Sequence, residues 1–102
     1  SHADLDHCNN APALYRGGPV TTTLVARSFL DMGQRCVVES CESARANGSR
    51  VRLAATGDRL RLDPAVDIAV LHPADGPPDE DDNANSLVLR ITYGGRTILL
   101  TG

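Results

Sequence analysis

SLVLRITYGGRTILLT, residues 86–101, is the stretch of this 102-residue chain that decides how its second half folds. Apolar and β-branched side chains dominate both sides of Gly94-Gly95, as is typical of strands. Two adjacent glycines also accept the positive backbone angles of a tight hairpin turn. The stretch therefore predicts two antiparallel strands, residues 86–93 and 96–101, joined at the glycines.

The residues before this hairpin predict further strands. Residues 66–71 are almost continuously apolar, which indicates a buried strand. Residues 51–55 and 59–62 each alternate apolar with polar side chains, and a turn at Gly57-Asp58 would make them neighbours. A loop rich in proline, glycine and acidic residues separates residue 71 from the hairpin. The second half is thus predicted to be a β-meander.

The first half is predicted to contain most of the helix. Residues 11–17 follow a helix-capping asparagine and end in glycine, and residues 21–25 are rich in β-branched threonine and valine. From residue 28 to residue 47, apolar side chains recur at helical spacing up to an Asn-Gly stop. These patterns predict a helix, a strand and a long helix. Residues 1–102 are therefore expected to form a single α/β or α+β domain.

Composition narrows the class of protein. The net charge of −3 argues against a simple basic nucleic-acid-binding module, and no apolar run is long enough to span a bilayer. The three cysteines form no CxxC pair and leave one over, so no disulfide framework is expected. We expect Cys8 to be a small buried residue.

Candidate metal ligands are concentrated at the start of the chain, where residues 2–7 read HADLDH. In an extended segment His2 and Asp4 point to the same side and can bind one ion. A turn after Leu5 would bring Asp6 and His7 toward a second ion. Imidazole nitrogen and carboxylate oxygen suit zinc, manganese or iron. Four ligands cannot complete two coordination shells, so further ligands must come from elsewhere.

Residues 2–7 resemble the HxDxDH variant of the HxHxDH metal motif of the metallo-β-lactamase superfamily. The rest of the chain is similar to the metallo-β-lactamase-like domain of ComEC-like proteins, which take part in bacterial competence and DNA uptake. One departure is Cys8-Asn9-Asn10, which stands where the family more commonly has Ile-Gly-Gly. The similar segments follow in the family's order with compatible spacing: residues 56–62, 70–73, 83–90 and 93–102.

The resemblance implies a fold and a set of site residues. The fold would be an αββα sandwich of two mixed sheets, and residues 1–102 would be a truncated version of it. An aspartate would follow Gly102 as the bridging ligand, and a further histidine would lie beyond it. Two divalent ions, zinc or manganese, would be the cofactors. The implied metal ligands are His2, Asp4, Asp6 and His7, with Asp6 also orienting the attacking water as a catalytic residue, and with Asn85 and Ser86 lining the site.

The function implied is metal-dependent hydrolysis of a phosphodiester, with DNA as the substrate in DNA uptake. Two alternatives stay open: a binding module of the same fold without catalysis, and a stand-alone hydrolase of a lactone, thioester or β-lactam. A stand-alone bacterial enzyme would be cytoplasmic, whereas a full ComEC-like protein would carry this domain membrane-attached and extracytoplasmic. This segment itself is expected to make no membrane contact. A truncated sheet should also expose edges through which chains associate.

Three other features have structural interpretations. His72 is expected to cap a strand end, and residues 79–82 to form a solvated acidic loop. Four arginines on alternate positions of two strands predicted to be adjacent are expected to share one exposed face. They are Arg50, Arg52, Arg59 and Arg61.

Overall fold

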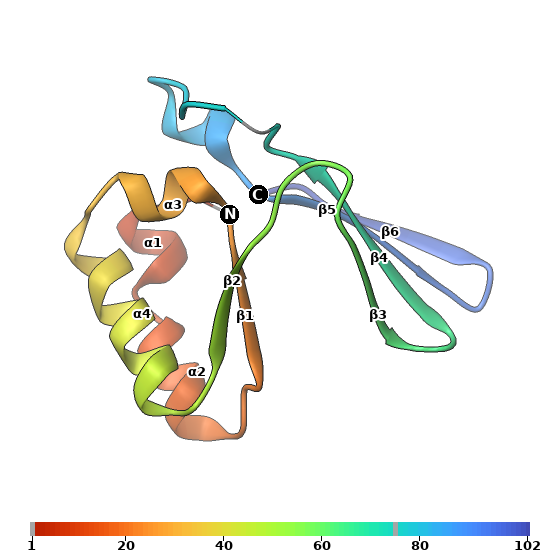
Figure 1. Cartoon of the computed structure of the whole chain (residues 1–102), viewed down its shortest axis with the longest axis horizontal. Helices are drawn as coiled ribbons and strands as arrows, with labels where there is room; N and C mark the ends of the chain where they lie inside the picture. Colours follow the sequence, from red (N-terminus) through yellow and green to blue (C-terminus); the bar gives the residue numbers. More distant parts are fainter. Residues whose placement is uncertain (1, 75) are drawn as a thin grey trace.

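The structure is a computed structural model that describes residues 2–74 and 76–102. It is a mixed α+β fold with strands in two separate sheets, one of two strands and one of four (Figure 1). The elements in chain order are α1 (Leu5–Cys8), α2 (Ala11–Gly17), β1 (Thr22–Val25), α3 (Arg27–Asp31), α4 (Arg35–Ala46), β2 (Arg50–Leu53), β3 (Arg59–Asp63), β4 (Val66–His72), the 3-10 helix η1 (Asp82–Asn85), β5 (Val88–Tyr93) and β6 (Arg96–Leu100).

The smaller sheet pairs β1 with β2 in parallel, in a register that runs from Thr22 opposite Arg50 to Val25 opposite Leu53. Parallel strands need a crossover connection, and α3 and α4 supply it. The helices gather on one side of this sheet, with α4 in contact with α1, α2 and β2 (Figure 1). This half of the molecule is therefore a βαβ unit with α1 and α2 packed on its long helix.

The larger sheet is the predicted meander, with strand order β3-β4-β5-β6 and every pair antiparallel. The hairpin at its end is confirmed: Tyr93 pairs with Arg96, and Gly94 and Gly95 have φ angles of 54° and 76°. A side chain at either glycine would be strained by that backbone conformation. The turn therefore depends on the two glycines from which it was predicted.

Two predictions about connections were wrong. The helix expected over residues 28–47 is two helices, because Gly33 adopts a φ of 60° between α3 and α4 and so ends the first of them. The hairpin expected at Gly57-Asp58 does not form either. Instead, Gly57 donates its N–H to Val70 O at 3.0 Å, and Asp58 O accepts from Val70 N at 2.9 Å. The turn residues pair with β4, so the chain leaves one sheet and enters the other.

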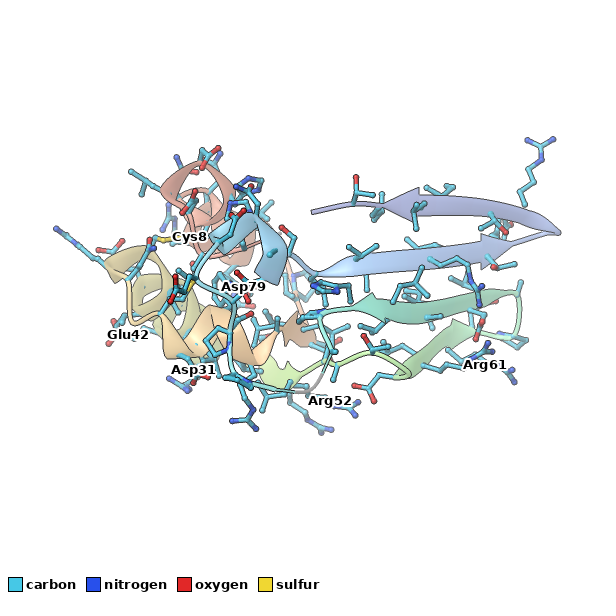
Figure 2. The ribbon with its side chains drawn as sticks, turned by 90° about the horizontal axis from the view of Figure 1, so that it is seen from above. Cys8, Asp31, Glu42, Arg52, Arg61 and Asp79 are labelled. Carbon is cyan, nitrogen blue, oxygen red and sulfur yellow. A yellow bond between two sulfur atoms is a disulfide. The ribbon has the colours of Figure 1, made fainter. Side chains whose placement is uncertain are left out.

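The shared arginine face was wrong for the same reason. Arg50 and Arg52 lie on β2 of the smaller sheet, whereas Arg59 and Arg61 lie on β3 of the larger one. Figure 2 shows Arg52 near the middle of the molecule and Arg61 near the far end of the larger sheet. Arg59 instead contacts Asp67 of the neighbouring strand, with Nη1 3.3 Å from Oδ2.

One face of the larger sheet is apolar. Leu60, Ile68, Ile91 and Ile98 lie opposite one another across the four strands, so they share a face. Toward β6 this face opens to solvent, since 57% of Ile98 is exposed. β6 is also an edge strand, with β5 as its neighbour on one side. Association of chains through this strand stays a prediction.

Candidate metal centre

The motif segment adopts a single helical turn in which the ligands expected from the sequence lie close together. Asp4 is extended and precedes α1, and its carbonyl oxygen accepts the N–H groups of His7 and Cys8 at 3.0 and 3.1 Å. The chain therefore turns at Leu5, as expected, but through a helix. This turn brings the ring of His7 against that of His2, with the centroids 4.2 Å apart.

His2 and Asp4 form the first pair of candidate ligands. His2 is 5% exposed, and its Nε2 lies 3.3 Å from Asp4 Oδ2. Two ligand atoms on one tetrahedral ion, each about 2.0–2.2 Å from it, are separated by about 3.3–3.6 Å. The other ring nitrogen, Nδ1, lies 3.0 Å from Ser86 Oγ. This hydrogen bond fixes the orientation of the ring and leaves Nε2 facing the carboxylate, as outer partners of histidine ligands do.

Asp6 and His7 form the second pair, which is more exposed. His7 Nε2 lies 3.8 Å from Asp6 Oδ2, and the Asp6 side chain is 81% exposed. His7 also lines a surface hollow next to the end of β6, together with Leu87, Leu89, Leu100, Thr101 and Gly102. The last residues of the chain therefore lie beside this second pair.

These residues could supply only part of the coordination shell of a metal ion. Within residues 2–74 and 76–102, no three histidine, cysteine, aspartate or glutamate side chains converge on one point. The His2–Asp4 pair has the spacing of two ligands on one ion, and the Asp6–His7 pair is somewhat wider. Each pair could bind an ion only with water or other residues completing the shell.

The two residues expected to line the site have different surroundings. Ser86 contacts His2 directly. Asn85 is equally buried, but its side-chain amide faces the acidic loop: it accepts from Asp79 N at 2.8 Å and donates to Asp79 O at 2.9 Å and Asp81 O at 3.0 Å. A buried amide needs such partners. Asn85 therefore stabilises the acidic loop, and these hydrogen bonds do not involve the histidines.

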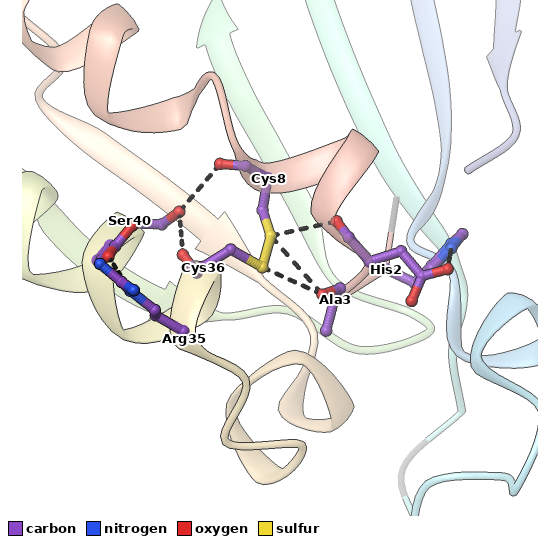
Figure 3. Close-up of a disulfide and its surroundings, with 8 residues drawn as sticks. His2, Ala3, Cys8, Arg35, Cys36 and Ser40 are labelled. Atoms are coloured by element: carbon purple, nitrogen blue, oxygen red, sulfur yellow. Dashed lines mark hydrogen bonds and ion pairs between the residues drawn. A yellow bond between two sulfur atoms is a disulfide. The ribbon is translucent and has the colours of Figure 1, made fainter.

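The expectation that the cysteines form no disulfide was wrong. Cys8 and Cys36 are bonded, with their Cα atoms 5.9 Å apart, and Cys41 is free and buried (Figure 3). The bond joins the end of α1 to the first turn of α4. Ser40 Oγ adds a link between the same two helices, since it lies 3.3 Å from Cys8 O and 2.6 Å from Cys36 O. The 28-residue separation of the two cysteines carried no sequence signal of this pairing.

Sequence patterns also gave no indication of an apolar cavity that is lined in part by His2 and His7. It has a volume of about 150 Å³ and lies between the helices and the smaller sheet. His2, His7 and Cys8 lie on one side of it, and β1 on another. The residues that line this cavity lie on six elements, from α1 to β2, so no local sequence pattern could have indicated the cavity.

The remaining candidates have structural roles. His72 Nε2 lies 2.6 Å from Ala84 O and so ties the end of β4 to η1, in line with its expected role at a strand end. In the acidic loop, Asp81 Oδ1 accepts the N–H of Asn83 at 3.0 Å. None of the helices in the described part of the chain is long and apolar enough to cross a membrane.

Comparisons of the chain with known protein families, with curated proteins and with solved structures find no match.

Proposed function

We propose that this chain is part of a dinuclear metal-dependent hydrolase of the ComEC-like metallo-β-lactamase type, acting on phosphodiester bonds of DNA. The observation that carries the proposal is the His2–Asp4 pair. Its two donor atoms have the separation of ligands on one ion, and Ser86 orients the histidine from behind. The His7 ring lies against that of His2, tilted by 48° with the centroids 4.2 Å apart, which supports two neighbouring sites.

Each pair would hold one ion, zinc or manganese. The resemblance implies a bridging aspartate directly after Gly102, and Gly102 lines the same hollow as His7. A residue in that position would start beside His7 of the second pair, which supports the proposed geometry. When bound, the two ions would polarise the phosphoryl oxygen and promote deprotonation of the attacking water. Asp6 would orient that water, since its exposed carboxylate can reach a molecule entering from solvent.

The sandwich fold is part of the same proposal. A sheet with one apolar face is built to pack against a second layer, and the face that carries Ile91 and Ile98 is of this kind. Its end at Leu89 and Leu100 reaches the hollow at His7. The candidate centre would then lie at the edge where the two sheets meet, as the resemblance implies.

Charge supports a phosphate as the reacting group. Two divalent ions bring about four positive charges, and Asp4, Asp6 and the implied aspartate remove about three of them when both histidines are neutral. The centre would then be slightly positive within a chain of net charge −3. That balance suits a single phosphate better than a long duplex backbone. We therefore propose single-stranded or short DNA as the substrate.

The disulfide supports an extracytoplasmic position. Structural disulfides persist in oxidising compartments and are rare in the cytosol. The Cys8–Cys36 bond thus favours a domain attached to a ComEC-like membrane protein over a stand-alone cytoplasmic hydrolase.

The second candidate function is a binding module of the same fold without catalysis. Two observations favour it: no three ligand side chains converge in the described residues, and His2 and His7 line an apolar cavity. Such a cavity accepts an apolar group more readily than a phosphate.

Metal binding distinguishes the candidate centre from an ordinary polar surface. We expect the 102-residue chain to bind manganese or zinc weakly, because each pair leaves open positions in the shell. His2→Ala should weaken this binding about tenfold or more. His72→Gln is the matched control, since this third histidine lies at the end of β4 and should leave binding unchanged. Calorimetric titration measures the metal affinity of the unmodified chain and of the two variants. Equal binding by the His2 variant would place any metal outside the motif.

Cleavage assays with the full-length protein test the proposed reaction. We expect labelled single-stranded DNA to be cleaved when manganese or zinc is added, and a chromogenic β-lactam to stay intact. Chelation should stop cleavage, and restoring the metal should recover it. Lactam turnover without DNA cleavage would assign the stand-alone alternative. Inactivity on both substrates would favour the binding module.

A further inference from the structure

The segment that carries all four candidate ligands is anchored at both of its ends. At one end the ring of His2 is bonded to Ser86, which precedes β5 of the larger sheet. At the other end Cys8 is bonded covalently to Cys36 of α4. His2, Asp4, Asp6 and His7 lie within these limits. Only the second anchor is a covalent bond, and it lies directly after His7.

The helix between the anchors has little stability of its own. α1 contains four residues, and a helix that short does not persist in water without tertiary contacts. Its contacts are concentrated at the disulfide. Ala3 is fully buried in a cluster with Cys8, Cys36, Val37 and Cys41, and Figure 3 shows the two bonded sulfur atoms beside Ala3. This cluster therefore contributes to holding His7 beside His2.

Among the described residues, the hydrogen bonds made by Cys8 and Cys36 are weaker than the covalent bond. Ser40 Oγ lies 3.3 Å from Cys8 O, but it is closer to Cys36 O, at 2.6 Å. Each sulfur atom also lies near a carbonyl oxygen, Cys8 Sγ 3.2 Å from Asp4 O and Cys36 Sγ 3.3 Å from Ala3 O. Bonded sulfur atoms carry no proton, whereas two thiols could donate weakly to these oxygens. Reduction would thus exchange a covalent link for weak hydrogen bonds.

We propose that the Cys8–Cys36 disulfide is the positioning element of the metal centre, so that metal affinity depends on the redox state of the pair. The inference rests on the proposed function. A dithiol reductant would transfer two electrons and two protons: the Cys8–Cys36 bond breaks, two thiols form, and the reductant becomes a disulfide. With that end of the segment released, α1 frays, and the Asp6–His7 pair is no longer held beside His2.

The first test measures binding of manganese by calorimetry in four samples: oxidised protein, protein reduced with a dithiol, the Cys8→Ser/Cys36→Ser variant, and the Cys41→Ser control. Manganese is the probe because the thiols released by reduction would themselves bind zinc. We expect the reduced protein and the double variant to bind at least about tenfold more weakly than the oxidised protein, and the control to match it. Reoxidation should restore the affinity.

The second test needs no metal. Histidine ring protons in the oxidised protein should show the chemical shifts caused by the tilted contact of the His2 and His7 rings, and reduction should remove those shifts. The His72 resonance should not change, because that residue lies on β4 and reports whether the larger sheet stays folded. A change at His72 as well would mean that reduction unfolds the whole chain, which overturns a local positioning role.

The two tests separate the inference from the function on which it rests. Equal manganese affinity in the oxidised and reduced proteins, with unchanged His2 and His7 resonances, overturns the inference and leaves the metal centre standing. Failure of every sample to bind manganese overturns the proposed function, and the redox dependence of metal affinity falls with it.

Discussion

Reduction of the Cys8–Cys36 disulfide should lower the free energy of unfolding by about 3–4 kcal/mol. The bond closes a loop across a sequence separation of 28 residues, and the loss of loop-closure entropy in the unfolded chain predicts that size. For a domain of about 100 residues this corresponds to a fall in the melting temperature of more than about 10 °C. Circular dichroism melts with and without a dithiol reductant measure the difference.

The control for this experiment is the Cys8→Ser/Cys36→Ser variant. It keeps Cys41, so any effect of the reductant on the free thiol would appear in both proteins. We expect the variant to melt near the temperature of the reduced protein and to be insensitive to the reductant. A reduced protein that melts within a few degrees of the oxidised one would show that packing alone holds α1 on α4.

A loss of this size would be a large part of the stability of a small domain, which is typically about 5–15 kcal/mol. The core here is small: among the described residues the largest fully buried side chain is that of Val70, and the chain has one phenylalanine and no tryptophan. Small folds with limited cores commonly depend on disulfides. The stability of this fold and the location proposed for it are therefore connected.

Local signals allowed much of the larger sheet to be predicted. Gly94-Gly95 readily adopts the positive φ angles of a tight turn. Residues 66–71 have no polar side chain except Asp67. Both features act within a few residues, so a single sequence suffices to identify them. The helix break was also visible locally, because Gly33 lies inside the apolar pattern of residues 28–47.

Features that depend on distant residues were not predictable. The parallel pairing of β1 with β2 depends on the crossover through α3 and α4, and nothing in residues 51–55 indicates a partner upstream rather than downstream. The disulfide was equally unpredictable, because it joins two cysteines that are 28 residues apart. For the candidate site, the sequence predicted four metal ligands and their order along the chain. It could not show that Ser86 reaches His2 across 84 positions, or that Asn85 next to it faces the acidic loop.

Substitution of Asp6 should have the largest effect on activity. Asp6→Asn in the full-length protein should reduce the rate of metal-dependent DNA cleavage by about 10²–10⁴-fold, the usual contribution of a group that handles a proton of the attacking water. The amide is nearly isosteric with the carboxylate, but it carries no charge to bind an ion and accepts no proton. Because the Asp6 side chain is 81% exposed, the fold loses almost nothing on substitution.

The comparison of activity with stability makes this substitution decisive. A residue kept for solubility alone would change neither quantity, and a residue kept for folding would change both. Asp31→Asn is the matched control, an exposed aspartate at the end of α3, and it should leave both the cleavage rate and the melting temperature unchanged. Rates are measured on labelled single-stranded DNA at saturating manganese, so that weaker metal binding is not mistaken for slower chemistry. Full activity of the Asp6 variant would remove both roles assigned to this carboxylate, that of a catalytic group and that of a metal ligand.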